Sequence, residues 1–422
     1  MRAWQRAKGW LQGRFLTDPY KVWGVLFGLF IVQGFCWATP GEIGRGLWAI
    51  VVAPGVLVTD YIAVGGLGAA LVNVGLAGLL AVGVLKMSGQ RPTGLTMGAL
   101  GLVAGFAFFG KNPLNMAPIL LGGLLYSKFM KKPYRDVVLP VVLGTCLAPA
   151  VGQMAGVGHW TLGLVLGVAV GLLIGFVIKP VAEAMAKVHE GNNLYNVGFS
   201  AGILGMGLFA LMRLVGISFE AAQIWSSGHN TELTIFLAVV AVYFTLCGLL
   251  SMGRNLSLGE LVDIDAPDND YYRRYEEKAY QAMGLMGFAM LGFMAMVGGE
   301  YSGPVLGAIM PVVGFGAFGK SLRHALPAMA GAMLAAVVSM AMTGKAFNSP
   351  AFLVGAIFST CLAPLSKNYG AGWGVVAGFL HQALVPYVGL VHGGLNLYNN
   401  GFAAGMAVML LLPIIKFLQR KG

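Results

Sequence analysis

The chain has 422 residues, of which 57% are hydrophobic and only 10% are charged. Soluble domains carry about 25% charged residues, so this composition excludes a soluble protein and predicts an all-α polytopic membrane protein. The net charge of +11 follows the predicted loops, and we therefore expect no nucleic acid as a partner. The four cysteines fall in apolar runs and predict buried thiols rather than disulfides or a zinc site. They are Cys36, Cys146, Cys247 and Cys361.

Residues 1–21 combine five Lys and Arg with two Trp, a pattern that predicts a cytoplasmic amphipathic helix at the membrane surface. We expect no removable signal peptide, because no cleavage site follows a short apolar core. The stretch 47–58 is apolar but broken by Ala53-Pro54-Gly55, and is either a re-entrant piece or part of a longer helix. The apolar segments are 22–39, 61–85, 94–109, 115–127, 137–154, 161–178, 197–216, 232–250, 281–298, 303–319, 325–343, 350–366, 371–391 and 400–417.

The distribution of basic residues predicts the orientation of these segments. With the N-terminus in the cytoplasm and the segments alternating, the inner loops and both termini hold 23 of the 27 Lys and Arg. The positive-inside rule favours this arrangement in the cytoplasmic membrane, with both termini inside. The inner loops are 86–93, 128–136, 179–190, 251–280, 320–324 and 367–370.

Three sequence blocks occur twice in the same order, with offsets of 203 to 215 residues. Residues 105–111 (GFAFFGK) match 314–320 (GFGAFGK) at five of seven positions, and 145–149 (TCLAP) match 360–364 completely. Residues 189–203 match 392–406 at ten of 15 positions. Such internal similarity indicates a duplicated unit.

Each repeat unit holds seven predicted segments, so its second copy enters the membrane from the opposite face. This predicts two inverted-topology repeats with discontinuous or re-entrant helices and about 10–14 membrane segments, an architecture of many transporters. Segment 115–127 is short of the ~20 residues that a span needs, and is a candidate re-entrant helix. The first repeat is predicted at 22–216. A connecting segment and the first span of the second repeat follow at 217–250, then a charged cytoplasmic linker at 251–280 and the remainder of the second repeat at 281–422.

The first block places a lysine at a helix break in each repeat. Lys111 and Lys320 precede predicted half-helices whose N-terminal N–H groups carry partial positive charge. With Asn112 and Asn115, they predict a path for an anionic or strongly dipolar solute. The alternative is that both lysines are interfacial anchors whose side chains reach the membrane surface.

The third block supplies amides and phenols before a glycine-rich helix. These groups can replace the hydration of a small polar solute. The alternative is a polar helix cap, because Asn is a good N-cap and Gly allows close approach. The residues are Asn193, Tyr195 and Asn196, with Asn396, Tyr398 and Asn399.

Other polar residues carry weaker signals. His189, Glu190 and His392 are candidates for a proton relay, although hydrogen-bonded loop histidines are the simpler interpretation. Thr145 and Thr360 precede Ala-Pro at matched helix breaks, where they either line the path or satisfy carbonyls that the proline frees. We expect neither a metal nor a cofactor, because no nucleotide-binding loop and no metal signature is present.

Phe109-Gly110-Lys111-Asn112-Pro113-Leu114 resembles the N-N-P-L-S-G pore stretch of urea transporters, and Tyr195-Asn196-Val197-Gly198 with Tyr398-Asn399-Asn400-Gly401 resembles their second motif. The resemblance implies two inverted repeats of five spans and a trimer. Two features depart from the urea-transporter motif, which has no lysine where Lys111 stands and has Asn-Pro where the second half has Ser321-Leu322. Across its whole length the chain resembles an uncharacterised family of bacterial multispanning proteins with a domain of unknown function.

We therefore expect a transporter or channel for a small polar or anionic solute, with the path between the repeats. The expected partners are this solute and the lipid bilayer, and assembly into a homo-oligomer is compatible with the sequence. The alternatives are an amide channel of the urea type and a membrane-embedded enzyme that uses the His and Glu positions. A structural membrane protein without any flux is a third class.

Overall fold

The computed structural model describes residues 11–266 and 268–420. Helices make up most of this part, and its β-structure consists of three isolated bridges. The helices are α2 (Pro19–Trp37), α3 (Pro40–Val52), α4 (Tyr61–Gly65), α5 (Leu67–Met87), α6 (Gly94–Phe106), α7 (Pro113–Phe129), α8 (Val138–Gly144), α9 (Ala148–Ala155), α10 (Trp160–His189), α11 (Asn196–Leu214), α12 (Asn230–Leu250), α13 (Leu258–Val262), α14 (Tyr271–Tyr275), α15 (Ala279–Val297), α16 (Gly303–Phe315), α17 (Leu322–Thr343), α18 (Pro350–Ser359), α19 (Ala363–Tyr369), α20 (Ala371–Val391) and α21 (Asn399–Gln419), with short turns at Leu11–Phe15, Tyr134–Asp136, Thr145–Leu147, Glu276–Lys278 and Thr360–Leu362.

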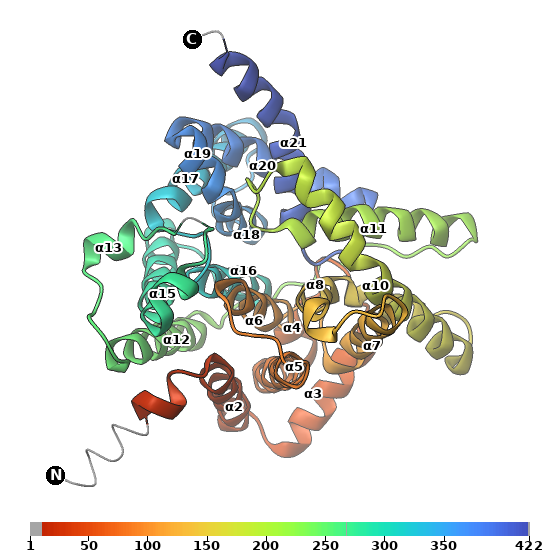
Figure 1. Cartoon of the computed structure of the whole chain (residues 1–422). Coiled ribbons are helices and arrows are strands. Elements are labelled where there is room, and N and C mark those ends of the chain that lie inside the picture. Colours follow the sequence, from red (N-terminus) through yellow and green to blue (C-terminus); the bar gives the residue numbers. More distant parts are fainter. Residues whose placement is uncertain (1–10, 267, 421–422) are drawn as a thin grey trace, which may run out of the picture.

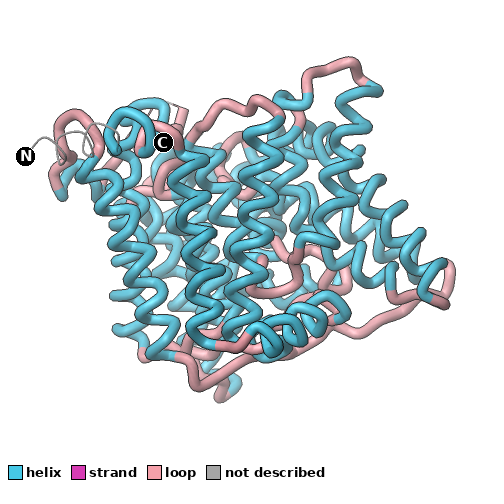
Figure 2. Tube along the Cα trace, turned by 90° about the horizontal axis from the view of Figure 1, so that it is seen from below, coloured by secondary structure: helices cyan, strands magenta, loops and turns pink. Residues whose placement is uncertain are grey.

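In the described residues, 11 helical stretches are long and apolar enough to cross a membrane. They are α2, α5, α8 with α9, α10, α11, α12, α14 with α15, α17, α18 with α19, α20 and α21. The long helices run side by side between two ends where most loops gather (Figure 2). The protein is therefore a polytopic helical membrane protein, as its composition predicts.

The centre of the bundle contains two short helices, α6 and α16 (Figure 1). Each has 13 residues, and all residues of α16 and all but one of α6 are buried. Thirteen residues give about 20 Å of helix, which is less than the ~30 Å hydrocarbon core of a bilayer. These helices therefore end inside the protein, and their free backbone groups need partners there.

Glycines allow α6 and α16 to touch along their backbones. A Cβ atom added at Gly105 would lie 2.2 Å from the Gly307 carbonyl oxygen, and one at Gly307 would lie 2.7 Å from that of Gly105. Gly101 and Gly314 make a second contact of this kind. Close approach through small residues is a common way to pack membrane helices, because lipid supplies no hydrophobic force between them.

Two buried aspartates cap these helices from the other half of the chain. Asp60, before α4, accepts hydrogen bonds from the Gly303 N–H at the start of α16 (3.0 Å) and from both the N–H and the hydroxyl of Ser226. Asp270, before α14, accepts one from the Gly94 N–H at the start of α6 (2.8 Å). A carboxylate at a helix N-terminus satisfies free N–H groups and the positive end of the helix dipole.

The two caps lie at opposite ends of the central pair. Phe109, after α6, forms a bridge with Asp60, and Phe318, after α16, forms one with Asp270. The C-terminal end of each helix thus lies beside the N-terminus of the other. It follows that α6 and α16 are antiparallel.

The two TCLAP blocks interrupt their helices as expected. A single 3₁₀ turn, Thr145–Leu147 or Thr360–Leu362, separates α8 from α9 and α18 from α19. The hydroxyl of Thr145 donates to the Val142 carbonyl (2.6 Å), and that of Thr360 donates to Ile357 (2.7 Å). The prediction of matched breaks is confirmed, and both hydroxyls satisfy a carbonyl of the preceding helix.

Polar contacts join several of the predicted inner loops. Lys86 pairs with Asp18 at 3.4 Å, Lys416 pairs with Glu190 at 2.6 Å, and Arg323 and Lys367 pair with Asp263 and Asp265. These loops and the start of α2 therefore lie at one end of the bundle. Beside them, Arg254 holds the pKa of Glu260 at about 2 through a charged hydrogen bond.

Several expectations are corrected by the structure. The predicted helix over 1–21 lies partly outside the described residues, and its described part is only the turn Leu11–Phe15 before α2. Within the charged linker predicted over 251–280, Tyr271 and Tyr280 are buried. Cys36 is exposed rather than buried. Segment 115–127 extends to the 17 residues of α7, and the stretch 47–58 ends its helix at Val52.

Replacement of Gly105 by alanine should destabilise the protein by roughly 1–3 kcal/mol, because the added methyl group would meet the α16 backbone. Thermal unfolding of the purified protein in detergent measures the effect. Gly28→Ala on α2 is the control, since nothing lies within 4 Å of its added Cβ. Equal melting temperatures for both variants would contradict the close backbone contact.

Replacement of Asp60 by alanine should cost several kcal/mol, on the order of 1.5–3 for each hydrogen bond to the carboxylate that is lost. Ile62 N–H also donates to Asp60, so four donors lose their acceptor. The same unfolding experiment applies, with the exposed Asp136→Ala as control. A variant as stable as this control would show that the buried carboxylate does not hold α16.

Candidate functional site

A cluster of five aromatic side chains occupies the centre of the protein. We call Phe106, Tyr195, Phe315, Phe358 and Tyr398 the aromatic cluster. The Tyr195 and Tyr398 ring centroids are 4.7 Å apart. Tyr195 contacts Phe315 at 5.1 Å, and Tyr398 contacts Phe106 at 5.2 Å. Each tyrosine thus packs edge-on against a phenylalanine from the other half of the chain.

Lys111 and Lys320, the matching lysines of the first repeated block, lie against this cluster and are almost fully enclosed. Lys111 is 1% exposed and Lys320 is 0% exposed. Lys111 Nζ lies 5.3 Å from the Phe106 ring centroid, and Lys320 Nζ lies 4.6 Å from that of Tyr195. This burial contradicts the alternative of interfacial anchors and removes Lys320 from the inner loop in which its sequence context placed it.

The two lysines differ in their hydrogen bonds. Lys320 Nζ donates to the Tyr195 hydroxyl and to Thr360 Oγ1, the latter at 2.9 Å. The matching Tyr398 hydroxyl has no hydrogen-bond partner, and Lys111 Nζ lies over the Phe106 ring. In the described part of the chain neither lysine forms an ion pair. Two lysine amino groups therefore lie in the interior without an acidic neighbour.

The polar blocks of the two halves bind each other's helix breaks. The Leu194 N–H donates to the Cys361 carbonyl (3.1 Å), and the Leu397 N–H donates to that of Cys146 (3.0 Å). Asn193 Nδ2 donates to the Gly401 carbonyl, and Asn396 Nδ2 donates to that of Gly198. Every contact occurs twice, with its counterpart about 200 residues away, so the two halves meet through matched interactions.

The other two asparagines are fixed within their own halves. Asn196 Oδ1 pairs with His189 Nε2 at 2.9 Å, and its Nδ2 donates to the Ala182 carbonyl. Asn399 makes the same pair of contacts, with His392 at 2.9 Å and the Val385 carbonyl at 3.0 Å. These amides are occupied by protein groups, which favours a structural role for them.

The remaining sequence candidates are also placed by local contacts. Asn112 and Asn115 form a capping box at the start of α7, in which each side chain accepts from the other's backbone N–H. Glu190 is half exposed and pairs with Lys416. Since His189 and His392 each pair with a different asparagine, the structure does not bring the three relay candidates together. In the described residues no group of three or more His, Cys, Asp or Glu could hold a metal.

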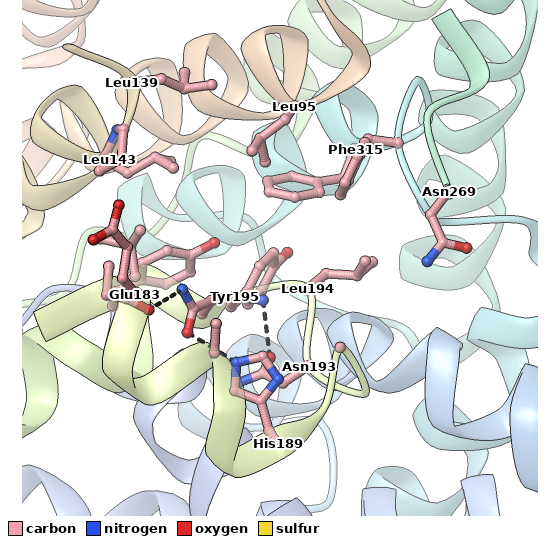
Figure 3. Close-up of a pocket in the computed structure, with 18 of the residues that line it drawn as sticks. Leu95, Leu139, Leu143, Glu183, His189, Asn193, Leu194, Tyr195, Asn269 and Phe315 are labelled. Atoms are coloured by element: carbon pink, nitrogen blue, oxygen red, sulfur yellow. Dashed lines mark hydrogen bonds between the residues drawn. The ribbon is translucent and has the colours of Figure 1, made fainter. Parts of the chain in front are cut away.

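Two cavities lie on either side of the aromatic cluster. The first has a volume of about 430 Å³, and its walls include Tyr195, Phe315 and Tyr398 (Figure 3). The second has about 530 Å³ and is lined by Phe358, with Leu397 and Phe109. The cluster therefore contributes to the walls of both cavities and lies between them.

The cavities border opposite ends of the bundle. Asp268 and Asn269, which precede α14, line the first, whereas Gln223 and Trp225, in the loop before α12, line the second. Helix α12 joins that loop to the linker and has 21 residues, or about 31 Å of helix. The two cavities thus extend from the centre towards opposite ends of the bundle, with the aromatic cluster between them.

The sequence interpretation missed Asp60 and Asp270, which cap the central helices. A signal was present, since Asp60-Tyr61 and Asp270-Tyr271 repeat at an offset of 210, within the range of the other blocks. It also missed Phe106, Phe315 and Phe358, because aromatic residues in apolar segments carry no local mark that they will meet.

The comparisons with known proteins assign a family. The profile described as "Protein of unknown function (DUF1576)" matches residues 39–214 and 266–417. The chain belongs to the DUF1576 family. The two matched ranges of DUF1576 contain both copies of each repeated block and leave out α2, α12 and α13. No curated protein and no solved structure matches the chain. The predicted membership in a family of unknown function is confirmed, and the resemblance to urea transporters stays a prediction.

Replacement of Asn196 or Asn399 by alanine should lower stability by about 1–3 kcal/mol, because each change leaves a histidine and a buried carbonyl without a partner. The two variants should be destabilised to a similar extent, since their contacts match. Thermal unfolding checks this, with the exposed Gln223→Ala as control. Unchanged stability in both would return these amides to the list of solute-binding groups.

Proposed function

We propose that this protein transports a small anionic solute across the cytoplasmic membrane, through a path between two inverted-topology repeats. The observation that carries the proposal is the pair of enclosed lysines beside the aromatic cluster, each without an acidic partner. Buried charges in membrane proteins are costly, and those that persist usually serve a solute path. An anion that passes the cluster would supply the missing counter-charge.

The matched contacts support the inverted repeat. The sequence blocks recur in order, the central helices are antiparallel, and the aspartate caps, polar blocks and lysines all have counterparts in the other half. In inverted-repeat transporters the solute site lies near the membrane midplane, between the repeats and next to discontinuous helices. The aromatic cluster has this position relative to α6 and α16.

The closed centre favours a carrier over an open pore. Aromatic side chains separate the two cavities, so passage needs their rearrangement. The lysines are not equivalent, because Lys320 is hydrogen-bonded to Tyr195 whereas the Tyr398 hydroxyl has no partner. In a repeat protein such asymmetry is expected if the two halves exchange conformations during transport, as in alternating access.

The path in this proposal is narrower than the sequence alone suggested. Lys111, Lys320, Tyr195 and Tyr398 line it, with Thr360 as a hydrogen-bond partner of Lys320. Asn193 and Asn396 hold the halves together, Asn196 and Asn399 are bonded within their own halves, and Asn112 with Asn115 caps the helix after Lys111. The loops joined by ion pairs face the cytoplasm under the positive-inside rule.

The test is solute flux in proteoliposomes for wild type, Lys111→Met, Lys320→Met and the double variant. Methionine has a similar volume and no charge, so removing a buried cation should leave the fold stable or more stable. Anion flux should fall at least tenfold in each single variant and vanish in the double variant. The exposed Lys187→Met is the control and should transport like wild type.

Two other outcomes would overturn this proposal. Flux of small neutral amides that is indifferent to the lysines would favour the amide channel instead. No flux of anions or amides from folded wild-type protein would exclude the transporter and favour an embedded enzyme or a structural protein. An enzyme that uses His189, Glu190 or His392 should then lose its activity when the histidines are replaced.

A further inference from the structure

The second cavity contains amide side chains that no protein group occupies. Gln382 on α20 and Asn400 on α21 line it, and each is only 4% exposed. Gln382 Oε1 and Asn400 Oδ1 have no hydrogen-bond partner. A buried polar group without a partner costs about 1–3 kcal/mol, so two in one cavity need an explanation.

The amides of the polar blocks show the contrast. Both side-chain atoms of Asn196 and of Asn399 are hydrogen-bonded to protein groups, and Asn193 and Asn396 are similarly fixed. Figure 3 shows two of these bonds beside the first cavity, one from the Tyr195 N–H to Asn193 and one between His189 and Asn196. The unpaired oxygens are thus particular to Gln382 and Asn400, since Asn399 lines the same second cavity with both of its side-chain atoms bonded.

The repeat itself marks these two positions as different. At the offset of 203 that relates the polar blocks, Gln382 corresponds to Lys179 and Asn400 corresponds to Val197, and both of those line the first cavity. Lys179 pairs there with Glu183 at 2.6 Å, and Val197 has no polar side chain. The duplicated scaffold therefore tolerates a valine at the position of Asn400, and the amide is not required for helix packing.

The local structure makes room for the glutamine. A Cβ atom added at Gly355 on α18 would lie 2.2 Å from Gln382 Oε1, so only glycine leaves space for this amide. His381 next to it is fully buried, and its Nε2 contacts the Asn400 carbonyl at 3.2 Å. The two amides are therefore held on adjacent helices around one cavity, and each keeps an unpaired oxygen beneath the cavity surface.

We infer that the second cavity is a recognition site for the uncharged polar part of the solute, and that the solute is a small carboxylate carrying a hydroxyl or amide group. This inference rests on the proposed function for the carboxylate. Gln382 and Asn400 form hydrogen bonds with the hydroxyl or amide when their side chains turn toward the cavity. Phe358, which lines this cavity, packs against Phe106, over which Lys111 lies, so the carboxylate reaches the lysine only when these rings move. The cavity of about 530 Å³ has a size typical of small-ligand sites.

The probes are lactate and propionate, which differ by one hydroxyl group. In proteoliposomes the wild type should transport lactate with a KM roughly tenfold below that of propionate, from about two hydrogen bonds. In Gln382→Leu/Asn400→Val the KM for lactate should rise about tenfold and that for propionate should stay the same. Gln153→Leu, which changes a glutamine outside both cavities, should behave like wild type.

A binding measurement separates this inference from the transport proposal. Lactate or neutral lactamide should raise the melting temperature of the wild type but not that of the double variant, whether or not flux occurs. Propionate and lactate with equal KM in the wild type, or an equal change for both in the double variant, would overturn the inference and leave anion transport standing. Stabilisation by lactamide without any flux would retain the recognition site and exclude the transporter.

Discussion

The fold depends on satisfying backbone groups that end inside a membrane protein. Helices α6 and α16 are too short to reach both membrane surfaces, so their first N–H groups cannot bind water there. Asp60 and Asp270 accept them instead, each from the opposite half of the chain. Because each half supplies the cap that the other half needs, neither central helix is complete without the partner half.

The same exchange governs the polar blocks. Each Leu-Tyr segment donates to the carbonyl at the other half's TCLAP break, and each preceding asparagine donates to the other half's glycine-rich helix. These bonds hold Tyr195 and Tyr398 against each other at the centre. The arrangement explains why a polar, glycine-rich sequence occurs twice in an apolar chain, since it builds the contact between the halves and positions the two phenols.

The proposed function rests on the ways in which the two halves differ. A perfectly symmetric pair would place equivalent groups on both sides of the aromatic cluster. Instead Lys320 binds Tyr195 and Thr360, whereas Lys111 lies over a phenylalanine ring, and only the second cavity has free amides. The shared scaffold places a cavity on each side of one centre, and on these differences rests our proposal that the lysines recognise charge and that Gln382 and Asn400 recognise a polar group.

The sequence by itself determined the membrane class, the positions of most helices, the duplication and the breaks at TCLAP. These follow from hydropathy, proline and identity between distant segments, all of which are local or countable properties. It also singled out Lys111 and Lys320, because a charge repeated in apolar sequence is costly. Their burial could not be read from the chain, and neighbouring Arg323 and His324 favoured a surface loop for Lys320.

Only the tertiary structure decided which polar groups are occupied. Asn196 and Asn400 both lie near the start of a glycine-rich helix, yet one is bound to a histidine and a carbonyl while the other has a free oxygen. A hydrogen-bond partner 14 residues away, or in the opposite half, is fixed by packing and leaves no mark in the residue's own surroundings. The sequence therefore names the polar side chains, and the fold determines which of them remain available to a solute.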